Sequence, residues 1–191
     1  MSLHSGERQV ASSLDGIRYD HVARYKFAAR SLPEKSRVLD IGCGTGYGCR
    51  VLADAGHSVI GIDNDTESLA YAGANFHSDS IEYIERDLNG WPKLGRQFDA
   101  AVCFETLEHL RDPRPMLRKI GCKRLLASVP NESLYKFTGQ QFHFRHYTKA
   151  EFEQLLTECG WKIQQWFTQD TITSDVREGH NGWTLIADCV R

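Results

Sequence analysis

Two carboxylates and an imidazole stand close together in the segment 104–110. Glu105, Glu108 and His109 have i, i+3, i+4 spacing, which places three side chains on one face of a helical turn. Such a face offers a general base for a hydroxyl nucleophile, or three ligands for a divalent cation. Because three ligands without an obvious fourth make an incomplete site, the sequence alone does not favour a bound metal.

Two further histidines, His143 and His146, lie in the segment 141–148, after an apolar run and before a helix-like segment. Imidazole can take a proton from a hydroxyl group near neutral pH. Either histidine could instead supply a fourth metal ligand, or could anchor the start of the following helix through hydrogen bonds. We therefore expect the catalytic base among His109, His143 and His146.

A glycine-rich turn follows the apolar run 37–41. Gly42, Gly44 and Gly46 leave no Cβ where backbone must come close to a ligand, and the helix that follows presents unpaired N–H groups. The same glycines could serve a tight turn without a ligand. Asp63 stands some 20 residues later, where a carboxylate can accept hydrogen bonds from both hydroxyls of a ribose. This pairing indicates a nucleotide-containing cofactor, and a dinucleotide would fit it equally well.

The elements that must position these residues alternate along the chain. Short apolar runs predict strands at 37–41, 58–63, 81–86, 98–104 and 124–129. The segments between them predict helices at 47–55, 66–76, 113–120 and 149–159. This alternation indicates an α/β fold in which helices cover a parallel sheet. Two final strands, 162–168 and 184–190, are expected to pair antiparallel, because glycine and asparagine residues between them favour a hairpin-type return.

The ends of the chain's helices carry their own signals. Thr148, with Glu151 three residues on, predicts a capping box at the start of the last helix, and Gly160 predicts its end. Residues 1–31 are expected to form a helical cap that closes over the cofactor, before a single domain at 32–191. Arginines interleave with apolar residues in this cap and, taken alone, indicate a solvated helix face: Arg18, Arg24 and Arg30.

The neighbours of the glycine turn narrow the kind of cofactor. The motifs are Asp40 before the first glycine, the turn itself, Asp63 after it, Arg86-Asp87-Leu88 after the third strand and the F-D-A-A-V run at 98–102. In this order they resemble the class I S-adenosylmethionine-dependent methyltransferases, over about residues 37–190. The resemblance implies a Rossmann-like, doubly wound sheet of seven strands in the order 3-2-1-4-5-7-6, with strand 7 antiparallel.

The same resemblance implies which residues hold S-adenosylmethionine. The methionine part would lie at Asp40, Gly42, Cys43, Gly44 and Gly46, the ribose at Asp63 and Asn64, and the adenine at Asp87 and Leu88, with Phe104 and Glu105 beside it. One departure is that Ile-Gly-Cys-Lys at 120–123 replaces the usual Pro-Gly-Gly before the fifth strand. That change shortens a turn and leaves the cofactor residues untouched.

The acceptor end resembles two groups of methyltransferases. The E-x-x-E-H run at 105–109 looks like that of the small-RNA 3'-terminal 2'-O-methyltransferases and the ubiquinone-pathway O-methyltransferases, where it binds a divalent metal. It is also common in the wider superfamily without metal. The N-terminal segment and the V-P-N run at 129–131 look like bacterial enzymes that modify sugars and surface polysaccharides.

We therefore expect O-methylation of a small hydroxylated acceptor, a sugar or glycoconjugate, with S-adenosylhomocysteine as the cofactor product. One alternative is metal-assisted O-methylation of an RNA terminus or a catechol. Another is a cofactor-binding subunit that depends on a partner. A dehydrogenase remains the rival explanation of the glycine turn.

Composition excludes several other classes of protein. The chain has 191 residues, 41% hydrophobic and 25% charged, the balance of one globular domain. A net charge of -2 argues against electrostatic binding of duplex nucleic acid. No stretch approaches the roughly 20 apolar residues that span a bilayer, and no apolar signal-peptide core begins the chain, so we expect no membrane partner and a cytoplasmic location. The six scattered cysteines are expected to be reduced and structural.

Overall fold

The computed structural model describes residue 3 and residues 8–90 and 97–191. Residues 1–2 and 4–7 of the expected N-terminal cap therefore lie outside the described residues. In chain order the elements are η1 (Leu14–Gly16), α1 (Tyr19–Ser31), β1 (Arg37–Ile41), α2 (Tyr47–Asp54), β2 (Ser58–Asp63), α3 (Thr66–Asn75), β3 (Ile81–Glu85), β4 (Ala100–Phe104), η2 (Leu107–His109), α4 (Arg114–Lys119), β5 (Arg124–Pro130), α5 (Lys149–Glu158), β6 (Lys162–Gln169), β7 (Arg177–Glu178) and β8 (Thr184–Val190).

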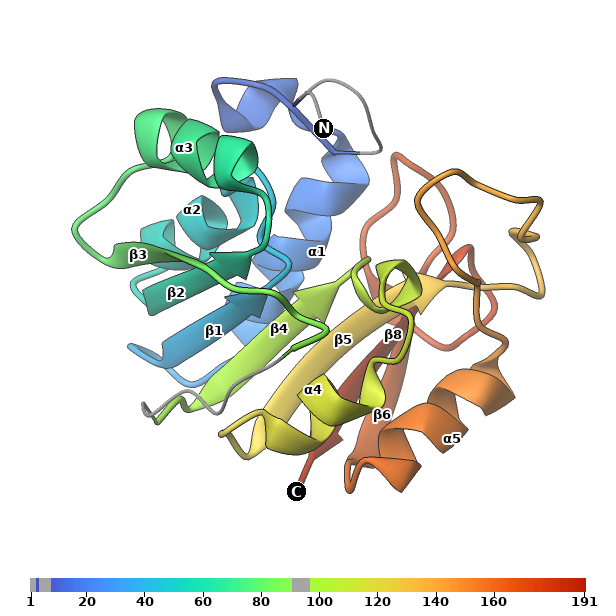
Figure 1. Cartoon of the computed structure of the whole chain (residues 1–191). Helices are drawn as coiled ribbons and strands as arrows, with labels where there is room; N and C mark the ends of the chain where they lie inside the picture. The colour runs from blue at the N-terminus through green and yellow to red at the C-terminus, as the bar shows by residue number, and fades with distance from the viewer. Residues whose placement is uncertain (1–2, 4–7, 91–96) are drawn as a thin grey trace.

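The strands of the described residues form one sheet in the order β3-β2-β1-β4-β5-β8-β6-β7 (Figure 1). The strands from β3 to β5 in this order run parallel, and β8 lies antiparallel between β5 and β6. The predicted seven-strand order is confirmed for the long strands, with β8 as the predicted antiparallel seventh. The additional strand β7, two residues paired with the end of β6, is not predicted from the sequence, because two residues are too few to show a hydrophobic period.

Parallel strand direction determines where a ligand can bind. β1, β4 and β5 end at the same edge of the sheet, and the start of α1 and the loops after β5 and β6 reach that edge (Figure 1). In doubly wound sheets the crevice for ligands opens at the carboxyl ends of the strands. The predicted site residues of β1, β2 and β4 all stand at these ends.

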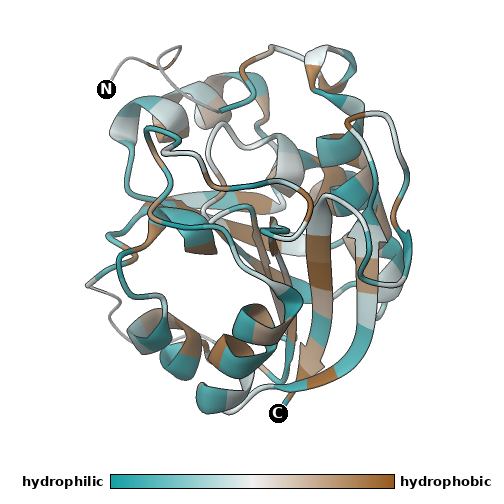
Figure 2. Ribbon diagram, turned by 90° about the vertical axis from the view of Figure 1, so that its right-hand side faces the viewer, coloured by the Kyte–Doolittle hydropathy of each residue, from teal (hydrophilic) through white to brown (hydrophobic). Residues whose placement is uncertain are grey.

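Two apolar layers hold the helices against the sheet. One layer packs α1 and α2 on one face through residues such as Tyr25 and Leu52, and the other packs α4 and α5 on the opposite face through Met116 and Phe152. β4 is buried along its whole length, as expected for a parallel strand covered on both faces. Figure 2 shows hydrophobic runs along the strands and hydrophilic stretches on the helices.

The last helix starts and stops at the predicted signals. Thr148 Oγ1 accepts the backbone N–H of Glu151, and the Glu151 carboxylate accepts the backbone N–H of Thr148, so the predicted capping box is confirmed. Gly160 follows α5 with a φ of 84°, which glycine adopts without a Cβ clash. The capping box fixes the point at which the loop after β5 enters α5.

Within residue 3 and the ranges 8–90 and 97–191, no helix is both long and apolar enough to cross a bilayer.

Candidate active site

The glycine turn closes tightly on the protein at its two ends and is open in the middle. Gly42, Gly44 and Gly46 have φ of 74°, 51° and 86°, the region that favours glycine. A Cβ on Gly42 would lie 2.4 Å from Thr106 Oγ1, and one on Gly46 would lie 2.5 Å from the Tyr83 hydroxyl oxygen. A Cβ on Gly44 would meet no described protein atom within 4 Å. A ligand can therefore approach the backbone at Gly44.

Asp63 orients its carboxylate beside this turn. The two carboxylate oxygens accept the backbone N–H groups of Gly44 at 2.9 Å and Asp65 at 3.0 Å. Asn64 follows as an exposed residue before α3. Because each carboxylate oxygen keeps a further lone pair, Asp63 can also accept hydrogen bonds from a ribose.

The residues predicted for the adenine end follow β3. Leu88 is buried in the core layer under α4 and α5. Asp87 is exposed, and its carboxylate accepts the backbone N–H of Asn89 at 2.9 Å. An apolar side chain next to an exposed carboxylate suits a flat base that carries an amino group.

Asp40 lies beneath the glycine turn in a closed polar network. Its side chain is fully buried and accepts hydrogen bonds from the Tyr25 hydroxyl at 2.9 Å and the Cys49 thiol at 3.2 Å. Burial, with a smaller contribution from the nearby charge of Asp63, raises the pKa of Asp40 to about 7, although the two hydrogen bonds act to lower it. Burial also raises the pKa of the Cys43 thiol in the turn, so Cys43 contributes its backbone and not a reactive thiolate.

Arg24 of α1 is a buried cation, although the arginine pattern alone indicates a solvated face. It is 2% exposed, and its Nε donates to Gln169 Oε1 at 2.8 Å. Its guanidinium nitrogens lie 3.7 Å from carboxylate oxygens of Asp20 and of Glu105. The signal available in the sequence was its place among apolar residues of α1, such as Val22. Arg24 ties α1 to the ends of β4 and β6.

A second side chain of α1 reaches the start of α2. His21 Nδ1 lies 2.8 Å from the Tyr47 hydroxyl oxygen, and Tyr47 directly follows the glycine turn. Burial lowers the pKa of His21 to about 3, so this histidine is neutral at physiological pH. Phe104, at the end of β4, packs edge-on against Tyr25 with ring centroids 5.1 Å apart. The role of α1 as a cover over the cofactor stays a prediction.

Glu105 does not share a helical face with Glu108 and His109, so that expectation is wrong. Glu105 has a φ of 47° and precedes a short 3₁₀ turn, η2, instead of an α-helical turn. Its carboxylate accepts the Ser128 hydroxyl at 2.7 Å. This left-handed residue turns the carboxylate toward β5 and Arg24, away from the other two side chains.

The structure instead brings His143 to Glu108 and His109. One potential ligand atom from each of the three residues lies within 4.8 Å of the others. Glu108 is fully buried, and the two imidazole rings meet edge-on with centroids 4.6 Å apart. The backbone joins the two segments as well, because Phe144 N donates to the Glu108 carbonyl oxygen at 2.8 Å. We call Glu108, His109 and His143 the histidine cluster.

The ring nitrogens of the predicted bases differ in what they contact. His109 Nδ1 lies 2.9 Å from the Phe142 carbonyl oxygen, which can only accept, so Nδ1 carries the hydrogen and Nε2 keeps a lone pair. His146 Nδ1 lies 2.7 Å from the Tyr135 carbonyl oxygen, and His146 Nε2 lies 2.7 Å from His143 Nδ1. Both nitrogens of His146 are thus engaged. His109 and His143 remain the candidate bases.

Exposed aromatic side chains lie beside the cluster, on the loop after β5 and directly before β8, and two of them, Tyr135 and Phe137, pack on His146. Tyr135, Phe137, Phe144 and Trp183 are 43%, 37%, 48% and 51% exposed. Tyr135 and Trp183 stack with an interplanar angle of 18°. Tyr147, by contrast, is buried and donates its hydroxyl to the Leu107 carbonyl oxygen.

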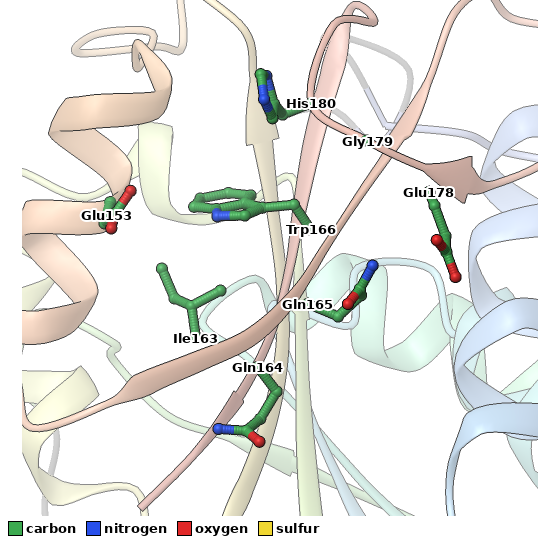
Figure 3. Close-up of a pocket in the computed structure, with 8 residues that line it drawn as sticks. All are labelled: Glu153, Ile163, Gln164, Gln165, Trp166, Glu178, Gly179 and His180. Carbon is green, nitrogen blue, oxygen red and sulfur yellow. The ribbon is translucent and has the colours of Figure 1, made fainter.

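A surface pocket of 520 Å³ lies elsewhere, at the outer edge of the sheet between α5 and the β6–β7 pair (Figure 3). Its lining includes Trp166, Glu153 and His180, and none of the predicted site residues belongs to it. The candidate site lies apart from this pocket, at the edge of the sheet where β1, β2, β4 and β5 end.

Relatives of this chain share the strands that carry the site. Residues 38–127 match the family described as methyltransferase domain. A probable S-adenosylmethionine-dependent methyltransferase of Mycolicibacterium smegmatis is 30% identical over 139 residues, which is 66% of this chain and 52% of that protein. The matched region thus spans about half the length of this relative.

Two further similarities cover a larger share of the matched protein. The ubiquinone biosynthesis O-methyltransferase of Haemophilus ducreyi is 36% identical over 165 residues, 76% of this chain and 68% of that protein. A chain of the complex between the Haloferax volcanii Trm112 methyltransferase activator and a methyltransferase shares the fold, with a TM-score of 0.75 and 20% identity over 91% of this chain and 90% of that chain. Together with the glycine turn and the strand order, these relatives show that the chain belongs to the class I S-adenosylmethionine-dependent methyltransferases.

Proposed function

We propose that this chain methylates a hydroxyl oxygen of a small acceptor, and that the acceptor is a sugar or glycoconjugate. The observation that carries the proposal is the histidine cluster, where two imidazoles and a buried carboxylate gather at the edge of the sheet that bears the cofactor residues. A base is useful there because the pKa of an alcohol is high.

The residues of the cofactor end fit S-adenosylmethionine. The backbone at Gly44 is open, and Asp63 has lone pairs for a ribose. When bound, S-adenosylmethionine supplies a methyl group on a sulfonium that leaves as a neutral thioether, so the leaving group needs no acid. The opposite charges of Arg24 and Glu105 suit the carboxylate and ammonium of an amino acid.

The histidine cluster supplies the proton acceptor for the acceptor hydroxyl. Nε2 of His109 or His143 takes the hydroxyl proton as the bond from oxygen to methyl carbon forms and the sulfur–carbon bond breaks. The buried carboxylate of Glu108 then stabilises the resulting imidazolium. The products are a methyl ether, S-adenosylhomocysteine and a protonated histidine, which returns its proton to solvent. In-line positioning of the hydroxyl supplies much of the remaining acceleration.

The sugar class is supported by the exposed aromatic side chains beside the histidine cluster. Exposed rings of Tyr135, Phe144 and Trp183 offer flat apolar faces, and such faces pack against the C–H faces of pyranose rings. The Haemophilus ducreyi relative is likewise named as an O-methyltransferase.

The second candidate is metal-assisted O-methylation of a catechol or an RNA terminus, and the histidine cluster is also the observation that favours it. Glu108, His109 and His143 provide one carboxylate and two imidazoles, a donor set that fits a first-row divalent cation and leaves coordination positions for acceptor oxygens. A cation held there would lower the pKa of the acceptor hydroxyl. Glu105, which the sequence pattern groups with these ligands, lies outside this set.

One experiment separates the two candidates. The purified chain is incubated with methyl-labelled S-adenosylmethionine and a cell extract, with and without exhaustive chelation, and the product is fractionated into carbohydrate, RNA, lipid and protein. Label in carbohydrate that survives chelation supports the sugar proposal. Chelator-sensitive label in RNA or in small phenols supports the metal-assisted alternative. Cofactor binding without label in any fraction contradicts both and leaves the partner-dependent subunit.

A further inference from the structure

We propose that His146 is a positioning residue that fixes the tautomer and the ring orientation of His143, and that it is not itself a base. The inference rests on the proposed function in one respect, since it gives His143 a role in the reaction. Its structural content, the state of one imidazole, can be measured without any acceptor.

The hydrogen-bond chain begins at a group whose polarity is fixed. The Tyr135 carbonyl oxygen has no hydrogen, so His146 Nδ1, 2.7 Å away, must donate. In a neutral imidazole the other nitrogen is then an acceptor. His143 Nδ1 lies 2.7 Å from that acceptor, His146 Nε2, and therefore carries a hydrogen. In the neutral ring of His143 the lone pair is then left on Nε2, in a ring that is grouped with the buried carboxylate of Glu108.

Packing holds the ring of His146 in place. Its side chain has no exposed surface, and the rings of Tyr135 and Phe137 pack on it with centroids 4.9 and 5.5 Å away. The charged group facing it is Glu132, whose carboxylate oxygen is 3.9 Å from His146 Nδ1 and also accepts the backbone N–H of Phe137 at 2.8 Å. Lys136 lies 3.8 Å from the other Glu132 oxygen and offsets its charge.

His109 and His143, the two candidate bases, thereby both carry their hydrogen on Nδ1, but through different contacts. His109 Nδ1 donates directly to a backbone carbonyl, that of Phe142, whereas His143 Nδ1 reaches a backbone carbonyl only through His146. In both, Nε2 holds the lone pair that either a proton or a cation requires. A histidine that serves as base or ligand is commonly fixed by such a hydrogen bond at its other nitrogen. Removing His146 should therefore affect His143 and spare His109.

Histidine nitrogen NMR on the ¹⁵N-labelled free protein tests the inference directly. We expect the Nδ1–H tautomer for His143 in the native chain, with its signal identified by its loss in His143→Ala. In His146→Phe, which fills the space without an acceptor, the Nε2–H tautomer should appear. In His146→Gln, whose side-chain oxygen can accept where Nε2 did, the Nδ1–H tautomer should be retained. An unchanged His143 tautomer in His146→Phe would overturn the proposal.

Turnover gives a second readout once an acceptor is known. We expect kcat to fall about 10- to 100-fold in His146→Phe and to recover most of that loss in His146→Gln, with unchanged affinity for S-adenosylmethionine. Exposed His77 gives the matched control, since His77→Phe should leave kcat and the His143 signal unchanged. Equal losses in His146→Phe and His146→Gln, with equal losses of thermal stability, would indicate packing alone and overturn the proposal. If His143→Ala is fully active, the role of His143 in the reaction fails and His109 is left as the base, while the tautomer result still stands.

Discussion

The proposed cofactor end and the proposed acceptor end of this molecule are built in different ways. At the proposed cofactor end, the glycine turn directly follows β1, Asp40 and Asp63 are among the last residues of β1 and β2, and backbone hydrogen bonds and positive φ values fix the geometry. At the acceptor end, the histidine cluster joins a 3₁₀ turn after β4 to a loop after β5. A local motif therefore predicts the first site, whereas the second exists only after long-range packing.

The largest effect expected from this contrast is at the acceptor end. We expect His143→Ala to lower kcat about 10²- to 10⁴-fold, the usual contribution of a general base, and to leave the affinity for S-adenosylmethionine unchanged. Steady-state kinetics and calorimetric titration of the cofactor measure the two quantities. His77→Ala, at an exposed site, is the control. Loss of cofactor affinity in His143→Ala would show that the two ends are not separable.

The buried carboxyl of the cofactor end should set a pH dependence of stability. The pKa of Asp40 in the folded chain is about 7, against 3.8 as its ordinary value. Between about pH 4 and 7 the folded state therefore holds a proton that the unfolded chain has released, and the free energy of unfolding falls as pH rises. The full loss is on the order of 4 kcal/mol, reached above the folded pKa.

Asp40→Asn removes this titration. We expect the free energy of unfolding of the variant, relative to the native chain, to rise with pH across that window, as measured by urea denaturation. His21 also contributes to the pH dependence, because its pKa is about 3 in the folded chain against 6.5 as its ordinary value, so the free energy of unfolding decreases as pH falls below 6.5. This contribution is the same in both proteins and cancels in the difference. A constant difference from pH 4 to pH 8 would contradict the assignment.

Substitutions at two glycines of the turn, Gly42 and Gly44, should separate a loss of stability from a loss of cofactor affinity. Both Gly42→Ala and Gly44→Ala place a side chain at positive φ, which costs about 1–2 kcal/mol. Gly42→Ala also drives a Cβ into Thr106, which adds about 1–3 kcal/mol of overpacking. Gly44→Ala meets open space instead, so its added cost should appear as weaker cofactor binding. Urea unfolding and calorimetry on both variants test this, and equal stability losses would refute it.

The smallest effect on activity and stability should come from a change at the start of α5, the helix that follows the loop after β5. Thr148→Ala removes half of the capping box and should lower the free energy of unfolding by about 1 kcal/mol. We expect kcat to stay within about twofold, because the cluster is held by contacts to Phe142 and His146 and not by this cap. Thr157→Ala, later in α5, is the control for replacing a helix threonine. A large loss of kcat in Thr148→Ala would mean that α5 orders the acceptor end.

Sequence patterns predicted the fold well because its central strands are largely apolar and buried. The glycine turn and the cap of α5 depend on residues within a few positions of one another, whereas the strand order was an expectation from the resemblance to the methyltransferase family. Glu105 was grouped wrongly because one left-handed residue reverses the direction of a side chain, and no hydrophobic period reports that. His143 could be proposed as a ligand or base, but its contact with His109 depends on the path of the loop after β5. Arg24 was hidden because an arginine among apolar residues is more often solvated than buried.

The buried thiols have a practical consequence for labelling. All six cysteines are buried and outside disulfides, and burial raises the pKa of each thiol. Maleimides and iodoacetamides react with the thiolate form of cysteine, so we expect the native chain to react with them only very slowly. A single cysteine introduced at exposed Thr138, in the loop after β5, would then be labelled selectively with a fluorophore. The fluorophore would report on this loop in an otherwise unaltered protein.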